Sequence, residues 1–178
     1  MRAHGVASRC FLTAVSLIVA TGCGYHLVGT SSSLPADLQT LYVQQFDNNT
    51  SWADMDQRLV EEITQEWVRR GRFRIVNEQR EADALLSGAI LSLAVSPVSF
   101  DERGRATEYQ MTLTTAVRLA DIRGDEPAVL WEDKAFQRRT SYQVDVSAVD
   151  YFDRQVEAMD ELSREYSRAL VSAVLEGF

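Results

Sequence analysis

Residues 108–119 alternate between two kinds of side chain, and this pattern constrains the fold more than any other part of the sequence. One set is mostly apolar: Tyr109, Met111, Leu113, Thr115, Val117 and Leu119. The other set is mostly polar: Glu108, Gln110, Thr112, Thr114, Ala116 and Arg118. Successive side chains of a β-strand point to opposite faces of the sheet, so a period of two predicts a strand with one buried face. The chain must therefore supply a second layer that covers one face of a sheet.

Two further strands are predicted beside this one. Residues 84–100 are rich in Leu, Val and Ala, and Pro97 predicts a bulge or bend within that strand. Residues 129–142 form the third strand. Turn sequences separate the three strands at residues 101–104 and 123–125. The three strands are expected to form an antiparallel meander.

Two segments show the spacing of amphipathic helices, and they supply the covering layer. They are residues 54–70, followed by Gly71 where a helix cap is expected, and residues 150–175. Four side chains of the first helix are expected to face solvent: Glu61, Glu62, Gln65 and Glu66. Both helices are predicted to pack on the same face of the sheet.

Two shorter strands flank the first helix. Residues 41–46 precede it and end at the turn sequence 47–50, and residues 73–76 follow it. The element order β-α-β-β-β-β-α predicts an α+β, two-layer sandwich, with two helices on one face of a mixed, mostly antiparallel sheet. We expect one domain over residues 37–178.

The first 22 residues have the pattern of a secretory signal. A basic start and an apolar run of about ten residues are followed by small residues and Cys23. That run is shorter than the ~20 residues that span a bilayer, so processing is expected. The segment Ala20–Cys23 resembles a bacterial lipobox, in which the thiol receives a diacylglycerol. Residues 1–22 are therefore interpreted as a lipoprotein signal peptide, and residues 23–36 as an acylated N-terminus and tether; a plain secreted protein is the alternative.

Composition excludes several classes of function. The formal charge of −8 becomes −10 once Arg2 and Arg9 leave with the leader, which argues against a nucleic-acid partner. Both cysteines and both histidines lie within the first 26 residues, so the body of the chain has no imidazole or thiol for a metal site, a catalytic triad or a redox pair. We expect no enzymatic activity, no cofactor and no metal.

Several motifs in fixed order resemble one known family, the lipopolysaccharide-assembly lipoprotein (LptE) family. They are Gly22–Leu27, the strand 41–46 with Asn48–Thr50, Ala82–Asp83 followed by Leu85–Ile90, and Gly104–Met111. The resemblance covers nearly all of the mature chain. It implies an outer-membrane lipoprotein that acts as a 1:1 plug and assembly aid inside the LptD-like β-barrel of the lipopolysaccharide translocon, facing the periplasm, and that contacts lipopolysaccharide.

A second class of function stays open beside this one. Small α+β lipoproteins of similar outline also dock on peptidoglycan enzymes or other envelope complexes as periplasm-facing regulators. Capture of a large barrel protein would favour the plug, whereas capture of a glycan synthase would favour the regulator.

Arginine supplies nearly the whole basic complement, and its planar guanidinium suits the phosphates of lipopolysaccharide. Arg103 and Arg105, in the turn where the resemblance places anionic-lipid contacts, are the first candidates. Arg138 and Arg139, expected at the end of the last strand, are the second pair. For both pairs the alternative is a solvated, charged surface without a binding role. A third basic group, residues 69–74, is interpreted as a charged helix end that stabilises the helix dipole.

Overall fold

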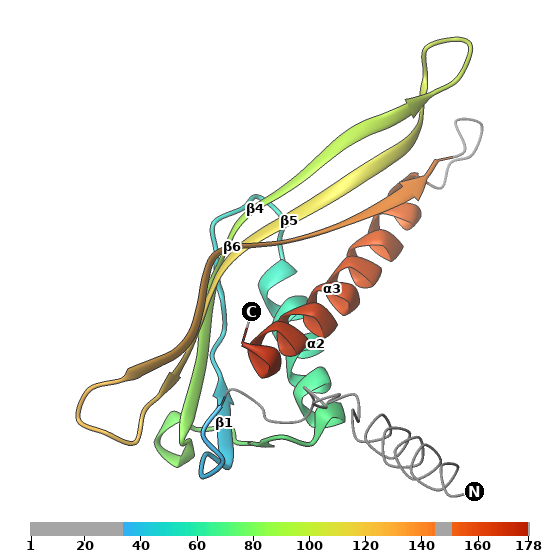
Figure 1. The fold of residues 1–178 in the computed structure, drawn as a ribbon. Coiled ribbons are helices and arrows are strands. Elements are labelled where there is room, and N and C mark those ends of the chain that lie inside the picture. Colours follow the sequence, from blue (N-terminus) through green and yellow to red (C-terminus); the bar gives the residue numbers. More distant parts are fainter. Residues whose placement is uncertain (1–33, 145–150, 178) are drawn as a thin grey trace, which may run out of the picture. The chain divides into compact units, whose positions relative to one another are not determined.

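The computed structural model describes residues 34–144 and 151–177, all within one compact unit that comprises residues 32–178. A six-stranded sheet is covered on one face by two helices (Figure 1). In chain order the elements are β1 (Thr40–Val43), β2 (Asp47–Asn48), α2 (Met55–Arg70), β3 (Arg74–Ile75), the 3-10 turn η1 (Gln79–Glu81), β4 (Ala84–Phe100), β5 (Ala106–Asp121), β6 (Ala128–Gln143) and α3 (Tyr151–Glu176). The predicted α+β class, the order of the main elements and the single helical layer are confirmed.

The sheet has a small parallel part and a large antiparallel part. Its strand order is β3-β1-β4-β5-β6, and β2 pairs separately with β4. β1 is parallel to β3 and β4, whereas β4, β5 and β6 form the expected antiparallel meander. The meander supplies the longest strands of the molecule, so it determines where the remaining elements lie.

The first strand differs from its prediction at one end. β1 stops at Val43, and the expected turn residues Asp47 and Asn48 form β2 instead, in parallel register with β4. The chain leaves the sheet between the two strands because Phe46 turns inward and is buried. The N–H of Asn49 then donates to the carbonyl of Ile90 at 3.1 Å, which returns the chain to β4.

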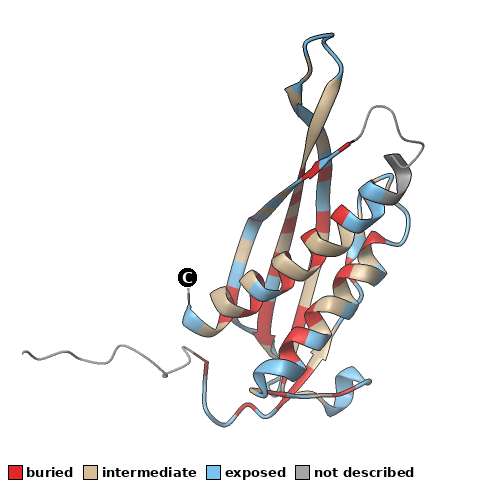
Figure 2. Cartoon of the chain, turned by 90° about the vertical axis from the view of Figure 1, so that its right-hand side faces the viewer, coloured by how far each residue is buried: buried red, intermediate tan, exposed pale blue. Residues whose placement is uncertain are grey.

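The core lies between the two helices and the face of the meander that the alternation predicted to be buried (Figure 2). Its largest fully buried side chains include Trp67, Tyr166, Phe46 and Met111. The hydroxyl of Tyr166 lies 2.6 Å from Oγ1 of Thr115, so the two polar groups satisfy each other inside the core. Leu34, which the sequence placed in the tether, is also buried in this core. The described end of the tether therefore packs on the domain.

Glu66 does not face solvent as the sequence predicted. Its side chain is buried, and its two carboxylate oxygens accept hydrogen bonds from the guanidinium groups of Arg69 and Arg70, at 2.9 and 2.8 Å. Burial alone raises the pKa of the Glu66 carboxyl, but these two bonds hold the pKa below its usual value. Arg70 also donates to Oγ of Ser172 at 2.8 Å, so this charged cluster joins α2 to α3.

Asp83 fastens the start of β1 to the start of β4. Its Oδ2 accepts the backbone N–H groups of Gln39 and Thr40 at 2.8 and 2.9 Å, and its own N–H donates to Oγ1 of Thr40 at 2.8 Å. The two backbone N–H groups lower the pKa of this carboxyl. This aspartate therefore supports the parallel part of the sheet.

Gly88 marks the closest approach between β4 and its neighbours. A Cβ at this position would lie 2.7 Å from the carbonyl oxygen of Ala116 and 2.7 Å from the ring of Phe46. Only a residue without a side chain allows the Phe46 ring and the Ala116 carbonyl to come this close to β4.

We expect Gly88→Ala to lower the free energy of unfolding by about 1–3 kcal/mol, because backbone and a buried ring must both move to admit the methyl group. Denaturant unfolding measures the change. Gly124→Ala is the matched control, since a Cβ there meets its nearest atom, the carbonyl oxygen of Glu126, at 3.6 Å. Equal stability of the two variants would contradict the packing described for Gly88.

We expect Asp83→Asn to destabilise the fold in a pH-dependent way. Because the folded pKa of Asp83 is lowered, its carboxylate contributes stability above its unfolded pKa near 3.9, and this contribution is lost as pH falls through the folded value. The variant is expected to be about 1 kcal/mol less stable than wild type at pH 6. Urea unfolding across a pH series measures the gap, which is expected to narrow below about pH 4. A gap that does not change with pH would contradict this role.

Candidate functional site

One residue that the sequence marked for function lies outside the described residues. It is Cys23, the expected site of lipidation. Its role stays a prediction, and the site is built from the remaining candidates.

The tip of the β4–β5 hairpin projects beyond the helices (Figure 1). Within the tip, the N–H of Asp101 donates to the carbonyl of Arg105 and the N–H of Gly104 donates to the carbonyl of Asp101, both at 2.9 Å. Oδ1 of Asp101 also accepts the N–H groups of Arg103 and Arg105, at 2.9 Å each. Gly104 has a φ of +74°, a conformation that glycine adopts without strain. The turn is thus organised around one carboxylate.

The two arginines of the tip differ in what they can bind. The guanidinium of Arg105 donates through Nε to Oδ2 of Asp101 at 2.8 Å, and its Nη2 lies 2.8 Å from the same oxygen. The backbone N–H of Arg105 and then this guanidinium hold the pKa of Asp101 below its usual value. Arg103 is exposed, and among the described residues its guanidinium has no ion-pair partner. Arg103 is therefore the cation of the tip that is available to an anion.

Two exposed apolar side chains lie beside these arginines, and the sequence analysis did not identify them. Phe100 is 59% exposed and Val98 is 46% exposed. Both lie at register shifts in β4, Val98 between Pro97 and Ser99 and Phe100 directly after Ser99. A bulge turns side chains off the alternating pattern, so the bend predicted at Pro97 was the signal that could have located them. The tip thus combines apolar surface with a free guanidinium.

The prediction that Arg138 and Arg139 lie at the end of the last strand is wrong. The two residues also do not form one patch. They lie inside β6, opposite Leu113 and Thr112 of β5, so their side chains point to opposite faces of the sheet. Arg138 lies on the helix-covered face, where its guanidinium is 4.8 Å from the centre of the Phe136 ring and donates to the carbonyl of Gln137. Arg139 is exposed on the helix-free face.

The structure does not bring these two arginines to the hairpin tip. Leu113, the partner of Arg138, is eight residues along the chain from Arg105, or roughly 26 Å at the rise of a strand. The four predicted candidates therefore form one tip site and two separate positions on β6.

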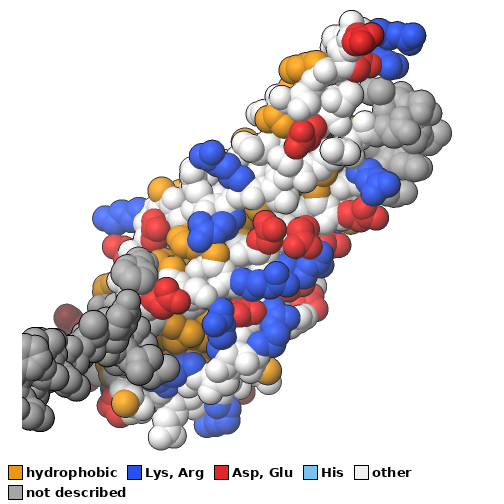
Figure 3. Space-filling view, turned by 45° about the vertical axis from the view of Figure 1, so that its right-hand side comes forward, with side chains coloured by type: hydrophobic (Ala, Val, Ile, Leu, Met, Phe, Trp, Pro, Cys, Tyr) orange, Lys and Arg blue, Asp and Glu red, His pale blue; other side chains and the backbone are white. Residues whose placement is uncertain are grey.

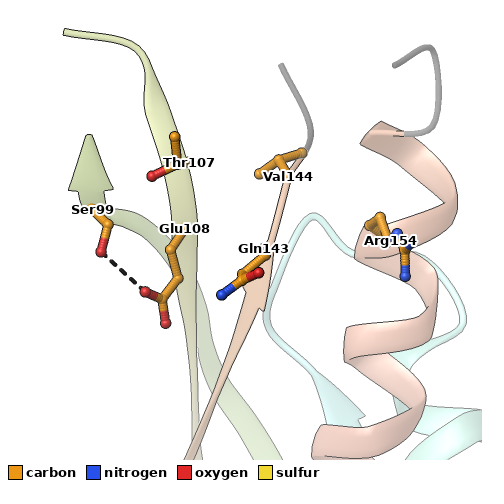
Figure 4. A pocket seen from close by; sticks show the side chains of 6 residues that line it. All are labelled: Ser99, Thr107, Glu108, Gln143, Val144 and Arg154. Atoms are coloured by element: carbon orange, nitrogen blue, oxygen red, sulfur yellow. Dashed lines mark hydrogen bonds between the residues drawn. The ribbon is translucent and has the colours of Figure 1, made fainter. Parts of the chain in front are cut away.

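A hollow of about 600 Å³ lies at the base of the tip (Figure 4). Its lining residues come from β4, β5, α3 and the last strand with the residue after it: Ser99, Thr107, Glu108, Gln143, Val144 and Arg154. Oγ of Ser99 donates to Oε2 of Glu108 at 3.0 Å. Hydroxyl, amide, carboxylate and guanidinium groups thus surround one hollow, a set that can exchange hydrogen bonds with a hydroxyl-rich or charged ligand.

The helix-free face of the meander is polar and carries few charges. It follows from the strand register that one set of side chains shares this face: Ser92, Ala94 and Ser96 of β4, Gln110, Thr112 and Thr114 of β5, and Gln137, Arg139 and Ser141 of β6. Nε2 of Gln137 donates to Oγ1 of Thr114 at 3.0 Å across two strands. Hydroxyl and amide groups therefore cover much of a long surface that no element of residues 34–144 and 151–177 overlies.

The helical side of the molecule is different, because cationic and anionic side chains are interspersed over it (Figure 3). Arg58 forms an ion pair with Asp160 across the two helices, and Arg164 pairs with Glu161. In the basic group 69–74, Arg72 donates to the carbonyls of Leu38 and Pro35. Together with the bonds from Arg69 and Arg70 to Glu66, these contacts agree with a structural role for that group.

Neither described helix combines the length and the apolar character that a membrane-crossing segment needs.

Comparison with known proteins identifies the family. The family model described as LptE, lipopolysaccharide-assembly, matches residues 38–174. No curated protein sequence matches the chain.

Two solved structures with TM-scores above 0.5 share the fold at low sequence identity. Protein CT253 from Chlamydia trachomatis superposes with a TM-score of 0.55 at 12% identity, covering 79% of this chain and 97% of that one. Protein XCC0632 from Xanthomonas campestris gives a TM-score of 0.54 at 13% identity, covering 79% and 85%. Lipoprotein B from Nitrosomonas europaea gives a TM-score of 0.45 at 21% identity, covering 86% and 96%. The match of the family model over most of the domain shows that the chain belongs to the lipopolysaccharide-assembly LptE family.

Proposed function

We propose that this protein is a lipid-anchored outer-membrane component of the lipopolysaccharide translocon, which docks as a plug in an LptD-like β-barrel and contacts lipopolysaccharide through its hairpin tip. The proposal includes no catalytic step. The observation that carries it is the division of the meander into two surfaces: a polar, helix-free face along its length, and a hairpin tip with exposed apolar side chains and one unpaired guanidinium.

The polar face suits the wall of a polar barrel lumen. The interiors of large membrane barrels are lined with polar side chains, so a plug must exchange hydrogen bonds with them over a broad area. Neutral hydroxyl and amide groups lose less hydration energy on contact than charged groups do. The side chains of Gln110, Thr112 and Ser141 meet both conditions, and they lie on a sheet face free of the chain's own helices.

The tip suits an amphiphilic, anionic lipid. Lipopolysaccharide presents phosphates on a lipid disaccharide, next to acyl chains. The free guanidinium of Arg103 can donate to a phosphate, and the exposed side chains of Phe100 and Val98 can pack against acyl chains. The hollow that contains Glu108 and Arg154 lies at the base of the same tip, where sugar hydroxyls would reach.

The anchor places both surfaces at the outer membrane. A diacylglycerol on Cys23, together with an acylated N-terminus, would hold the protein stably, because two or more chains anchor where one does not. Gly24 stands where aspartate acts as a retention signal for the inner membrane in many lipoproteins, so we place the protein in the outer membrane.

We expect Arg103→Glu to weaken lipopolysaccharide binding by about tenfold, because it replaces the free cation of the tip with an anion. Phe100→Ser is expected to weaken binding by a similar factor through lost apolar contact. Titration of the detergent-solubilised lipoprotein with fluorescent lipopolysaccharide measures both.

Arg80→Glu is the control for these variants, since Arg80 is equally an exposed arginine but belongs to η1, at the other end of β4. If Arg103→Glu and Phe100→Ser both bind like wild type, the tip is not the lipid contact.

We expect Thr112→Trp to abolish co-purification with the barrel, because a large ring in the middle of the polar face prevents flat docking. The control is Gln57→Trp, which places the same ring on the exposed surface of α2. Affinity purification from outer membranes measures the captured barrel. Loss of capture by both variants, or by neither, would show that the helix-free face is not the docking surface.

A further inference from the structure

The outer edge of β6 is long, regular and unoccupied by any element of the described chain. β6 ends the strand order of the sheet, so one of its two sides has no neighbouring strand. From Phe136 to Gln143 it pairs with β5 in eight consecutive register positions without a shift. At the rise of a strand this segment is roughly 27 Å long.

Alternate residues of this segment turn their backbone groups outward. The N–H of Val144 donates to the carbonyl of Thr107 at 2.9 Å, which makes these two residues a hydrogen-bonded pair. Hydrogen-bonded and non-bonded pairs alternate along an antiparallel ladder. The outward residues are therefore Gln137, Arg139, Ser141 and Gln143. In agreement with this pattern, the carbonyl of Gln137 accepts from the guanidinium of the neighbouring Arg138 at 2.7 Å.

The opposite free edge of the meander is unsuitable for strand pairing. The pairing of β4 with β2 ends at Ile90. From Ile90 to the hairpin tip, the side of β4 opposite β5 therefore has no neighbouring strand among the described residues. That part of β4 contains Pro97 and three register irregularities, all of which interrupt an edge. The β6 segment contains no proline and no shift. Of the two open edges, only β6 offers a continuous set of donors and acceptors.

The charge of the β6 edge determines which strand it accepts. Between Lys134 and Gln143 the strand contains three cations, Lys134, Arg138 and Arg139, and no anion. A second copy paired antiparallel over residues 135–143, with outward residues opposite one another, would place Arg139 of the two chains directly opposite, and like charges across a strand pair are destabilising. An extended segment that carries carboxylates would instead form attractive charge pairs with Lys134, Arg138 and Arg139.

We propose that β6 accepts an extended acidic segment of the barrel partner as an added strand, hydrogen-bonded to residues 137, 139, 141 and 143. The inference rests on the proposed function, because the barrel supplies the segment. The new strand extends the polar sheet face and exchanges the Arg138 bond to Gln137 for contact with a carboxylate of the segment.

Amide hydrogen exchange in the purified complex with the barrel tests the proposal residue by residue. In the free protein we expect β5 to protect the N–H groups of residues 138, 140 and 142, and we expect those of residues 137, 139, 141 and 143 to exchange quickly. In the complex we expect exchange of the second set to slow by at least tenfold. Unchanged exchange at these residues in an intact complex overturns the added strand but not the plug, whereas failure to form any complex overturns both.

Ser141→Pro removes one outward N–H without touching the bonds to β5, and Ser141→Ala is its matched control. We expect the proline variant to bind the barrel about tenfold more weakly than the alanine variant, which loses the same hydroxyl from the polar face but keeps its outward N–H. Slow exchange at residues 138, 140 and 142 in the free proline variant verifies that β6 is intact.

Arg139→Glu tests the charge of the segment and is expected to weaken binding, whereas Arg139→Lys is expected to preserve most of it. Equal binding by Ser141→Pro and Ser141→Ala with β6 intact, or by Arg139→Glu and wild type, contradicts the acidic strand.

Discussion

Two helices have to cover a meander that is longer than they are, and most of the surface chemistry of this molecule depends on that mismatch. β4, β5 and β6 contain 17, 16 and 16 residues, or roughly 54 Å of strand, whereas α2 contains 16 residues, or roughly 24 Å of helix. Even α3, with 26 residues, reaches only about 39 Å. The core can therefore form only beneath the helices, on one face of the meander. The other face, the hairpin tip and the β6 edge remain available to partners.

The composition of the helix-free face agrees with burial against a partner better than with permanent exposure to water. The exposed helical side carries interspersed, largely paired charges such as Arg164 and Glu161, which keep a surface soluble at little cost. The helix-free face instead carries serine, threonine and glutamine, with Arg139 as the charge in its central part. Neutral groups can be dehydrated and bonded again at lower cost than ions. The contrast between the two sides argues for a docked face and a solvated face.

Sequence reasoning predicted the parts of the fold that local periodicity determines. The alternation in β5 predicted its buried face correctly, and Gly71 has the expected left-handed conformation, with a φ of +64°. Predictions from the sequence were wrong where a contact joins segments that are far apart along the chain, and where a bulge shifts the alternation of side chains in a strand. Glu66 is buried because two arginines neutralise it and Ser172 of the distant α3 holds one of them, which no local pattern reveals. Bulges in β4 change the alternation and expose Phe100. Consecutive residues of a strand point to opposite faces of the sheet, so Arg138 and Arg139 of β6 cannot form one patch.

The arrangement of charges at the tip limits how an anionic glycolipid can be recognised. The whole chain has a formal charge of −8, and the two acidic residues of the tip turn balance its two arginines, so long-range attraction contributes nothing to encounter. Arg105 is already bound to Asp101, which leaves Arg103 as the free donor of the tip. Under the proposed function, recognition would then depend on close contact, with apolar burial on Phe100 and Val98 supplying most of the affinity and one guanidinium selecting for phosphate.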